Sequence, residues 1–438
     1  MRRSKVLLRL VLFLSVLIPI SGCRAAENPR ALDAYVHASD SSFQWKIKSQ
    51  SKSADILSLT SQTWQGGKWN HQLTIVKPDH DASPGTALLL IDVGGTPDVM
   101  QFLKVLANGS GATVVGLSNV PNQPLYGRAE DALIAYTFQK FMETGDQTWP
   151  LLLPMTKSAT AAMDAVQEYS KSTSTPITKF IVGGASKRGW TTWLVAAEDK
   201  RVIGIVPMVY DNLNLPKQLP HQKEMLGDYS SQIGDYTKLD LPHQLTTPRG
   251  MELVQIVDPY FYRDRITMPK LIINGANDPY WTVDSLNLYY NDLGGPKNVF
   301  YIPNAGHSMN MTDSSGAVNL PGVFNLLGTI QSWTRIVAGG KTPPEVNLDV
   351  KDTAEGKHFT ASVAGGTAGE LWVAKSTSRD FRQSTWVASP MKNINGHFEG
   401  DVKTPESGYV AVFAQLALPG TASLPMHLST PMTVWGAN

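Results

Sequence analysis

Lys179-Phe-Ile-Val-Gly-Gly-Ala-Ser-Lys-Arg-Gly-Trp190 is the stretch of this sequence that decides the fold. Its first six residues form an apolar run that predicts a buried strand, and the residues from Trp190 to Ala197 predict a helix. Between them lies a turn of small residues that contains Ser186. Strand, sharp turn and helix are the context in which a nucleophilic serine is lifted above the edge of a sheet.

The flanking sequence repeats this alternation of apolar strands and helices. Further buried strands are predicted at Thr86 to Val93, Thr113 to Leu117, Val202 to Val206, Lys270 to Ile273 and Val299 to Ile302. Strands that alternate with helices predict a mostly parallel sheet, and alternating runs between residues 43 and 76 predict an antiparallel N-terminal edge. We therefore expect an α/β fold of the α/β-hydrolase type over residues 41–338. An insertion at about 211–265, without clean periodicity, is expected to lie above the sheet like a lid.

Two further strand ends supply partners for a serine nucleophile. Asp278 follows the strand at 270–273, and His307 follows the strand at 299–302. In α/β-hydrolases the catalytic residues occur in the chain order serine, acid, histidine. The sequence therefore predicts Ser186 as nucleophile, His307 as base and Asp278 as acid, with Asp211, which follows the strand at 202–206, as the alternative acid.

Backbone amides near Ser186 are candidates for an oxyanion hole, the pair of donors that holds the negative oxygen of an acyl-transfer intermediate. The N-H of Lys187 is the first candidate, and Gly95 or Thr96, after an early buried strand, supplies the second. The common pattern is Gly-x-Ser-x-Gly, whereas this chain has Arg188 at the last glycine position and Gly189 after it. How closely helix and strand approach here is therefore an open question.

Charged residues at 128–131 are weaker candidates for substrate binding. Arg128, Glu130 and Asp131 open a predicted helix near the same edge of the sheet, where acidic residues also stabilise the helix N-terminus. Lys187 and Arg188 are expected to form ion pairs or to lie on the surface. The nine histidines show no metal-binding spacing, so no metal and no cofactor are predicted.

The sequence changes character after residue 338. A stretch at 338–344 rich in Gly and Pro predicts a linker, and short alternating strands follow to the end of the chain. We expect residues 343–438 to form a C-terminal all-β sandwich of the immunoglobulin or fibronectin III type.

The N-terminus predicts export and anchoring. Residues 1–22 have a basic start, a short apolar core and small residues before Cys23, as in a secretory signal peptide. Ile20-Ser21-Gly22-Cys23 resembles a bacterial lipobox, whose cysteine is acylated, and Cys23 is the single cysteine of the chain. We expect residues 23–40 to be a tether that holds a lipoprotein at the outer membrane, facing the periplasm. A net charge of +1 in 438 residues gives no electrostatic case for nucleic-acid binding.

At these residues the chain resembles the family of PhoPQ-activated pathogenicity-related proteins. The resemblance covers roughly residues 30 to 340 and is most specific at Ser-Lys-Arg-Gly-Trp190. Its other matching stretches are Trp149-Pro150, Leu153-Pro-Met155, Pro207-Met-Val209 with Asp211 and Asn214, Asp258-Pro259, Met268-Pro-Lys270 and Pro303-Asn-Ala-Gly-His307. The resemblance implies an α/β-hydrolase fold, an envelope location, a link to virulence or envelope stress, and catalytic roles for Ser186, Asp278 and His307.

These observations predict a serine hydrolase that cleaves an ester or amide bond of a small molecule or peptide. Two alternatives remain open: a non-catalytic binding protein that confers resistance to cationic peptides, and an acyltransferase that uses the same serine. The sequence does not predict the oligomeric state.

Overall fold

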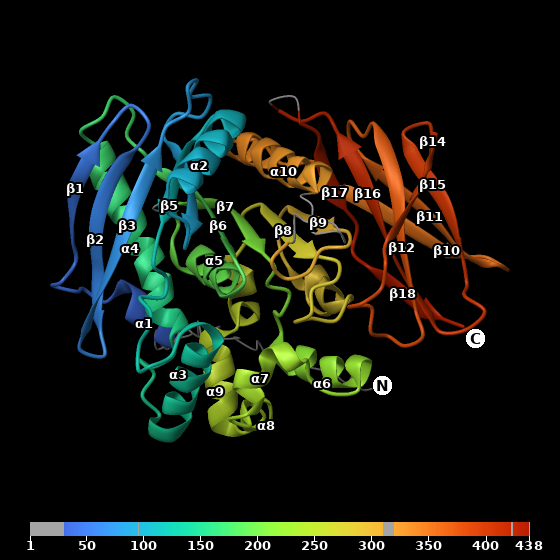
Figure 1. The fold of residues 1–438 in the computed structure, drawn as a ribbon, viewed down its shortest axis with the longest axis horizontal. Helices are drawn as coiled ribbons and strands as arrows, with labels where there is room; N and C mark the ends of the chain where they lie inside the picture. The colour runs from blue at the N-terminus through green and yellow to red at the C-terminus, as the bar shows by residue number, and fades with distance from the viewer. Residues whose placement is uncertain (1–29, 95, 310–318, 422–423, 438) are drawn as a thin grey trace, which may run out of the picture.

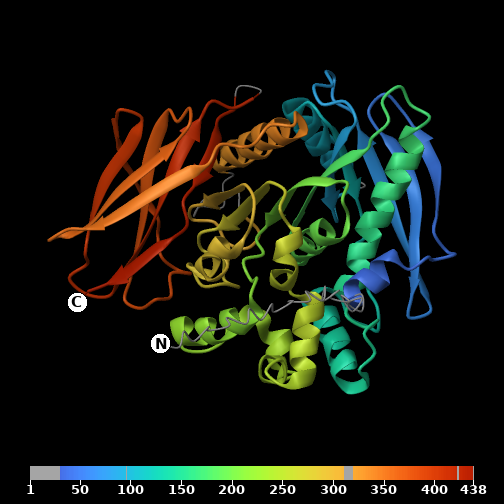
Figure 2. The ribbon, with the colours of Figure 1, turned by 180° about the vertical axis from the view of Figure 1, so that it is seen from behind.

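A computed structural model describes residues 30–94, 96–309, 319–421 and 424–437 (Figures 1 and 2). The predicted signal peptide, Cys23 and Gly95 lie outside the described residues. In the described part of the chain, no helix is both long enough and apolar enough to cross a membrane.

One large mixed sheet organises the molecule. Its first nine strands lie in the order β1-β2-β3-β5-β4-β6-β7-β8-β9, in which the pairs among β5, β4, β6, β7, β8 and β9 are parallel and β1, β2 and β3 form an antiparallel edge. These strands are β1 (Gln44–Gln50), β2 (Asp55–Trp64), β3 (Gly67–Val76), β4 (Thr86–Ile91), β5 (Thr113–Leu117), β6 (Lys179–Ala185), β7 (Val202–Met208), β8 (Lys270–Gly275) and β9 (Lys297–Ile302). From β2 onward this is the strand order of an α/β-hydrolase sheet. The predicted α/β fold with a mixed, mostly parallel sheet is confirmed.

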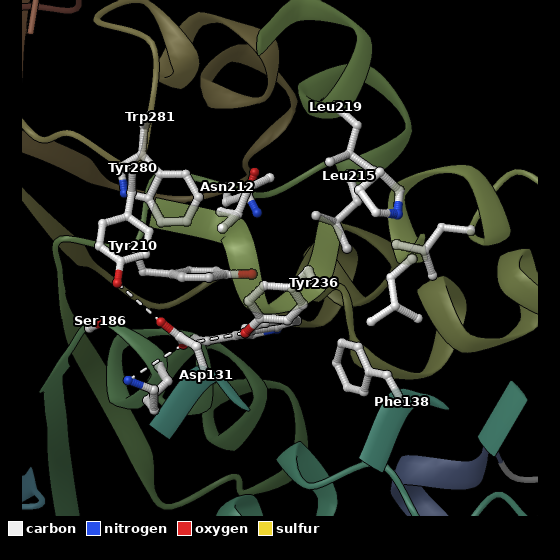
Figure 3. A pocket seen from close by; sticks show the side chains of 16 residues that line it. Asp131, Phe138, Ser186, Tyr210, Asn212, Leu215, Leu219, Tyr236, Tyr280 and Trp281 are labelled. Carbon is white, nitrogen blue, oxygen red and sulfur yellow. Dashed lines mark hydrogen bonds and ion pairs between the residues drawn. The ribbon is translucent and has the colours of Figure 1, made fainter. Parts of the chain in front are cut away.

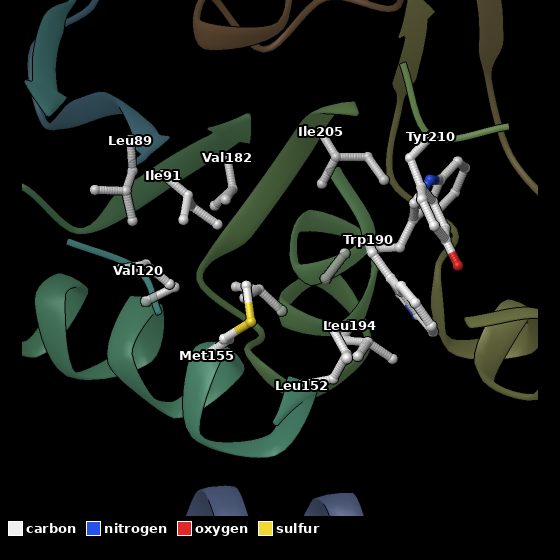
Figure 4. Packing of buried hydrophobic residues seen from close by; sticks show 14 of the residues in the cluster. Leu89, Ile91, Val120, Leu152, Met155, Val182, Trp190, Leu194, Ile205 and Tyr210 are labelled. Atoms are coloured by element: carbon white, nitrogen blue, oxygen red, sulfur yellow. The ribbon is translucent and has the colours of Figure 1, made fainter. Parts of the chain in front are cut away.

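Helices cover both faces of this sheet because the central strands are apolar on both sides. In β4, Leu89 and Ile91 pack toward one face, where they meet α4 and α5 (Figure 4), whereas Leu88 and Leu90 pack toward the other, with α2 and α10. The covering helices are α2 (Pro97–Ser110), α4 (Leu152–Ser170), α5 (Lys187–Glu198) and α10 (Leu320–Ala338). The helix α1 (Ala31–His37) packs on α4, and α3 (Glu130–Thr144) lies with the insertion. Two separate apolar cores therefore fix β6, the strand that ends at Ser186.

The predicted insertion is helical. Between β7 and β8 the chain forms several helices. Together with α3 they lie below the lower edge of the sheet in the view of Figure 1. They are α6 (Leu215–Leu226), η1 (Ser231–Ile233), α7 (Gly234–Thr237), α8 (Leu241–Gln244), α9 (Pro248–Val257) and η2 (Pro259–Arg265), and η3 (Ser285–Leu288) and η4 (Tyr290–Asp292) follow β8. This edge is the one at which the parallel strands end, so the insertion lies over the ends of β6 and β8.

The C-terminal part is all-β, as predicted, and consists of two packed sheets. One sheet extends the large sheet, because β17 pairs with β9, and the other has the order β10-β11-β15-β14. The strands are β10 (Val346–Asp352), β11 (Gly356–Val363), β12 (Ala368–Ser376), β13 (Val387–Pro390), β14 (Lys392–Ile394), β15 (His397–Lys403), β16 (Tyr409–Leu418), β17 (Met426–Ser429) and β18 (Thr433–Gly436). The pairing of β17 with β9 joins this part to the α/β part through a continuous sheet. An immunoglobulin or fibronectin III type stays a prediction.

Candidate active site

Ser186 occupies a sharp turn between β6 and α5. Its backbone has φ 57° and ψ −126°, a conformation that non-glycine residues rarely adopt, and its N-H donates to the carbonyl of Met208 at 2.8 Å. Strained backbone of this kind is typical of functional sites. Because the turn places Ser186 at the end of a buried strand and before the first turn of a helix, its hydroxyl faces the pocket beneath the insertion (Figure 3).

Two glycines permit this turn. They also explain how α5 can approach the sheet closely although Arg188 occupies the usual position of the second glycine. A Cβ atom at Gly184 would lie 2.7 Å from the carbonyl oxygen of Arg188, and one at Gly189 would lie 2.8 Å from that of Met208. Real Cβ atoms do not approach backbone so closely. The close approach of α5 to β6 and β7 therefore depends on Gly184 and Gly189, and the position of Arg188 does not require glycine.

A continuous chain of hydrogen bonds connects Ser186, His307 and Asp278. Nε2 of His307 lies 2.8 Å from Oγ of Ser186, and Nδ1 lies 2.8 Å from Oδ2 of Asp278. With the ring proton on Nδ1, His307 donates to the buried carboxylate and accepts the proton of the serine hydroxyl. The structure thus brings together three residues that lie up to 121 positions apart in the sequence.

Asp211 lies behind this chain and has a different partner. It is buried, and its Oδ1 accepts a hydrogen bond of 2.6 Å from the hydroxyl of Tyr289. Burial, together with the smaller effect of the nearby charge of Asp278, raises the pKa of Asp211 to about 7, against the opposing effect of the Tyr289 hydrogen bond. The residue that contacts the imidazole is therefore Asp278.

A pocket lined largely by apolar and aromatic side chains opens at Ser186 (Figure 3). It holds about 690 Å³ of space that no atom fills, part of it open to solvent. Tyr280 lies beside His307, with its ring 4.1 Å from that of His307 between centroids and its hydroxyl donating to Asp131 at 3.1 Å. Tyr236 donates to the same carboxylate at 3.3 Å. Asp131, a predicted binding residue, is therefore a polar group in the wall of a mainly apolar pocket.

Lys187 and Arg188 are buried and form ion pairs. Glu130 accepts hydrogen bonds from both, and Arg188 also pairs with Asp92, which follows β4, and donates through Nε to the carbonyl of Val120 at 2.6 Å. Burial alone would raise the pKa of Glu130, but the hydrogen bonds from Arg188 and Lys187 lower it to about 2. Arg188 thus joins the elbow to β4 and α3, which explains an arginine at this position.

The remaining predicted residues lie farther from the serine. Arg128 packs over the ring of Tyr136, 4.5 Å from its centroid, and does not line the pocket. Thr96 caps α2 by accepting from the N-H of Val99. Its loop is adjacent to the elbow because Ile91 at the end of β4 pairs with Gly184.

The sequence did not reveal the aromatic residues of the pocket, chiefly Tyr210, Tyr236, Tyr280 and Trp281. Tyr280 and Trp281 follow Asp278 directly, so their position after the predicted acid was a usable signal. Tyr236 belongs to the insertion, where no periodic pattern indicated which side chains point inward.

The C-terminal part anchors the two loops that carry Asp278 and His307. Asn277, next to Asp278, donates to the carbonyls of Phe381, Arg382 and Ser384, of which the last is at 2.7 Å. Asn304, three residues before His307, both donates to the carbonyl of Trp386 and accepts from its N-H. Segment 381–386 therefore positions both loops.

We expect Asn304→Ala to lower the free energy of unfolding by about 1–3 kcal/mol, because two hydrogen bonds to Trp386 are lost, and to slow any reaction at Ser186. Asn395→Ala is the matched control, since Asn395 also has a positive φ and lies in the exposed turn between β14 and β15, where its side chain makes no hydrogen bond to another segment that the structure describes. Chemical denaturation of both variants measures the difference. Equal losses would mean that backbone strain, and not the contact with Trp386, accounts for the effect.

Within the described ranges, no group of three or more His, Cys, Asp and Glu side chains is arranged to hold a metal ion.

The chain is similar to known proteins in sequence and in fold. The model of the PhoPQ-activated pathogenicity-related protein family matches residues 32–382. Autocrine proliferation repressor protein A of Dictyostelium discoideum is 33% identical over 431 residues, with 88% of this chain and 85% of that protein covered. Similar solved structures include acetyl xylan esterase 1 from Thermoanaerobacterium sp. JW/SL YS485, with 16% identity, a TM-score of 0.43 and coverage of 64% of this chain and 86% of that one. An esterase from Pyrobaculum calidifontis has 15% identity, a TM-score of 0.42 and coverage of 70% and 89%.

Proposed function

Because this chain belongs to the PhoPQ-activated pathogenicity-related protein family and brings a serine, a histidine and a carboxylate into one hydrogen-bonded chain, we propose that it is a serine hydrolase that cleaves an ester or amide bond. The observation that carries the proposal is the pair of 2.8 Å contacts of His307, to Ser186 on one side and to Asp278 on the other. A structural histidine has no need of a strained serine at the mouth of a pocket.

In this mechanism His307 accepts the proton of Ser186 as its Oγ attacks the substrate carbonyl, and then donates it to the leaving alcohol or amine. Water then attacks the acyl-enzyme with His307 again as the base, and this step releases the acid and restores Ser186. Asp278 orients the imidazole and stabilises its charged form.

We propose that the backbone N-H of Lys187 holds the oxyanion. As the first residue of α5, Lys187 has an N-H without a partner inside the helix, and the helix N-terminus adds a partial positive charge. The loop after β4, with Thr96 and Gly95, is the proposed source of the second donor.

Labelling with a fluorophosphonate tests the proposal. We expect the folded wild-type protein to be labelled, Ser186→Ala to show no label, and Ser53→Ala, a change in an exposed turn, to label as the wild type does. Only an activated serine reacts with the probe, so an unlabelled wild type would contradict the hydrolase and favour a binding protein. An acyltransferase would also be labelled, and it is separated by supplying an alcohol or amine acceptor and measuring acyl transfer against hydrolysis.

We also propose that the protein is exported and lipid-anchored through Cys23. The support is the sequence from Met1 to Cys23, with its basic start, short apolar core and single cysteine. In a Gram-negative host we expect Cys23→Ser to abolish incorporation of radioactive palmitate and to release the protein from the membrane fraction. Retention of the label by Cys23→Ser would rule out this anchor.

A further inference from the structure

The pocket at Ser186 is polar at one end and apolar at the other. Asp131 and the hydroxyl of Tyr280 lie near Ser186, whereas Leu215, Leu219 and Phe138 lie on the opposite side of the pocket (Figure 3). Polar groups that could bind the reacting carbonyl and its leaving group are thus concentrated near the serine. The part of a substrate that extends away from Ser186 meets mainly hydrocarbon and aromatic surface.

A second cavity, which we call the outer groove, lies on the other side of the apolar end. It holds about 1280 Å³ of unfilled space, part of it open to solvent, and its lining includes Pro216, Pro220, Tyr229, Met251 and Val254. Charged side chains, Lys223 and Glu224, are exposed at its rim. The outer groove lies between α6 on one side and α8 and α9 on the other.

Four side chains line both cavities: Leu215, Leu219, Pro242 and Leu245. We call this set the apolar wall. Leu215 and Leu219 come from α6, whereas Pro242 belongs to α8 and Leu245 follows it directly. The pocket at Ser186 and the outer groove therefore share these side chains as a common wall.

The hydrogen bonds of α6 do not hold the leucine side chains of the apolar wall in place. The polar face of α6 is fixed to segment 280–285, because Gln218 donates to the carbonyl of Ser285 at 3.0 Å, Gln222 donates to that of Tyr280 at 2.9 Å, and His221 pairs with Asp284 at 2.8 Å. The backbone N-H of Leu215, at the start of α6, donates to Oδ2 of Asp258, directly after α9, at 2.7 Å. In the part of the chain that the structure describes, no hydrogen bond or ion pair joins the remaining residues of α6 to α8 or α9. The wall can therefore open by rotation of leucine side chains without the loss of a polar contact.

We propose that the pocket, the apolar wall and the outer groove form one path that takes the long hydrocarbon chain of a fatty acyl ester or amide, with its carbonyl at Ser186. This inference rests on the proposed function and deepens it by naming the substrate class. A hydrocarbon chain suits the path because it needs no hydrogen-bond partners, and burial of each methylene strengthens binding by about fourfold. An extended peptide fits less well, since its backbone N-H and C=O groups would find no partners along the apolar wall.

The reaction follows the mechanism above without another reactant. Oγ of Ser186 forms a bond to the fatty acyl carbonyl, the bond to the alcohol or amine breaks, and His307 moves the serine proton to that leaving group. Water then releases the fatty acid. The chain stays in the path throughout, whereas the leaving group departs at the serine end.

Hydrolysis of a series of p-nitrophenyl esters tests this path, with acetate, butyrate, octanoate, laurate and palmitate as substrates below their micellar concentrations. For the wild type we expect kcat/KM to rise by at least about tenfold from butyrate to laurate. Met251→Trp, which fills the outer groove, is expected to lower the ratio of the palmitate to the butyrate value by about tenfold or more. Lys217→Trp, on the exposed side of α6 and in neither cavity, is the matched control for the added indole.

The outcomes separate this inference from the proposed function. Hydrolysis of butyrate with no gain for longer chains, or an unchanged ratio in Met251→Trp, overturns the acyl path and leaves the serine hydrolase intact. If Met251→Trp does not fold, Thr246→Trp at the exposed rim of the groove takes its place. Displacement of a fluorescent fatty acid from folded Ser186→Ala by palmitate, but not by butyrate, supports the path independently of turnover, and no binding of either overturns it.

Discussion

Replacement of Ser186 or of His307 by alanine is expected to lower kcat for the best ester substrate by about 10⁶-fold, and the double variant is expected to be no slower than either single variant. The two residues act as one unit, because Ser186 is a weak nucleophile until His307, at 2.8 Å, accepts its proton. Once one partner is absent, the other has nothing left to contribute. Independent effects would instead multiply.

Single-turnover kinetics at saturating enzyme measure these losses without interference from product release. His358→Ala is the matched control, because His358 and Asp401 form another His–Asp pair with a 2.8 Å contact, on β11 and β15 of the four-stranded sheet, and neither residue lines the pocket at Ser186. Its kcat should stay within about threefold of the wild type. A loss of less than about 100-fold in His307→Ala would mean that His307 is not the base.

Much of the α/β part could be predicted from the sequence because its signals are local. The strand, turn and helix around Ser186 are contiguous in the chain, and the positions of Asp278 and His307 follow from the rule that each catalytic residue comes after a strand. Buried parallel strands such as β4 are continuous apolar runs, which few other elements of this length produce. These features need no knowledge of which segments meet in space.

The helices of the insertion could not be predicted, because their stability is not local. The helix α6 contains Pro216 and Pro220, and α7 and α8 have four residues each, too few to show a periodic pattern. Isolated helices of this length are unstable, so packing against Tyr280 and its neighbours decides their conformation. The lining of the pocket at Ser186 could not be predicted for the same reason, because part of it comes from these helices.

Contacts between segments that are distant in the sequence could not be predicted either. The strand β17 was not predicted, and its pairing with β9 joins Ser429 to Val299, 130 positions apart in the sequence. Glu130 was predicted as a candidate substrate-binding residue at the start of a helix, whereas the structure makes it the acceptor for Lys187 and Arg188. A local charge pattern indicates that a charged residue needs an ion-pair partner, but it does not identify which distant residue that partner is.

Asp278→Asn is expected to lower kcat by about 10⁴-fold, the loss that follows when the imidazole is held in the wrong tautomer. An amide at this position offers an N-H where His307 needs an acceptor at 2.8 Å from Nδ1. Asp211→Asn is expected to change kcat by less than about fivefold. Its carboxyl accepts from Tyr289 and contacts no part of the imidazole, and an amide oxygen can accept the same hydrogen bond. The reverse order of the two losses would make Asp211 the acid.

The pH dependence of stability gives a second test of these roles. Because burial raises the folded-state pKa of Asp211 to about 7 from an ordinary 3.8, its contribution to stability is complete below about pH 3.8 and is lost as the pH rises through about 7. Asparagine cannot ionise, so Asp211→Asn should lose less stability than the wild type between pH 5 and pH 8 in chemical denaturation. A parallel decline in both proteins would show that Asp211 is already ionised at pH 5. Two negative carboxylates, Asp211 and Asp278, would then lie behind His307 at neutral pH, and the small effect expected for Asp211→Asn would no longer follow.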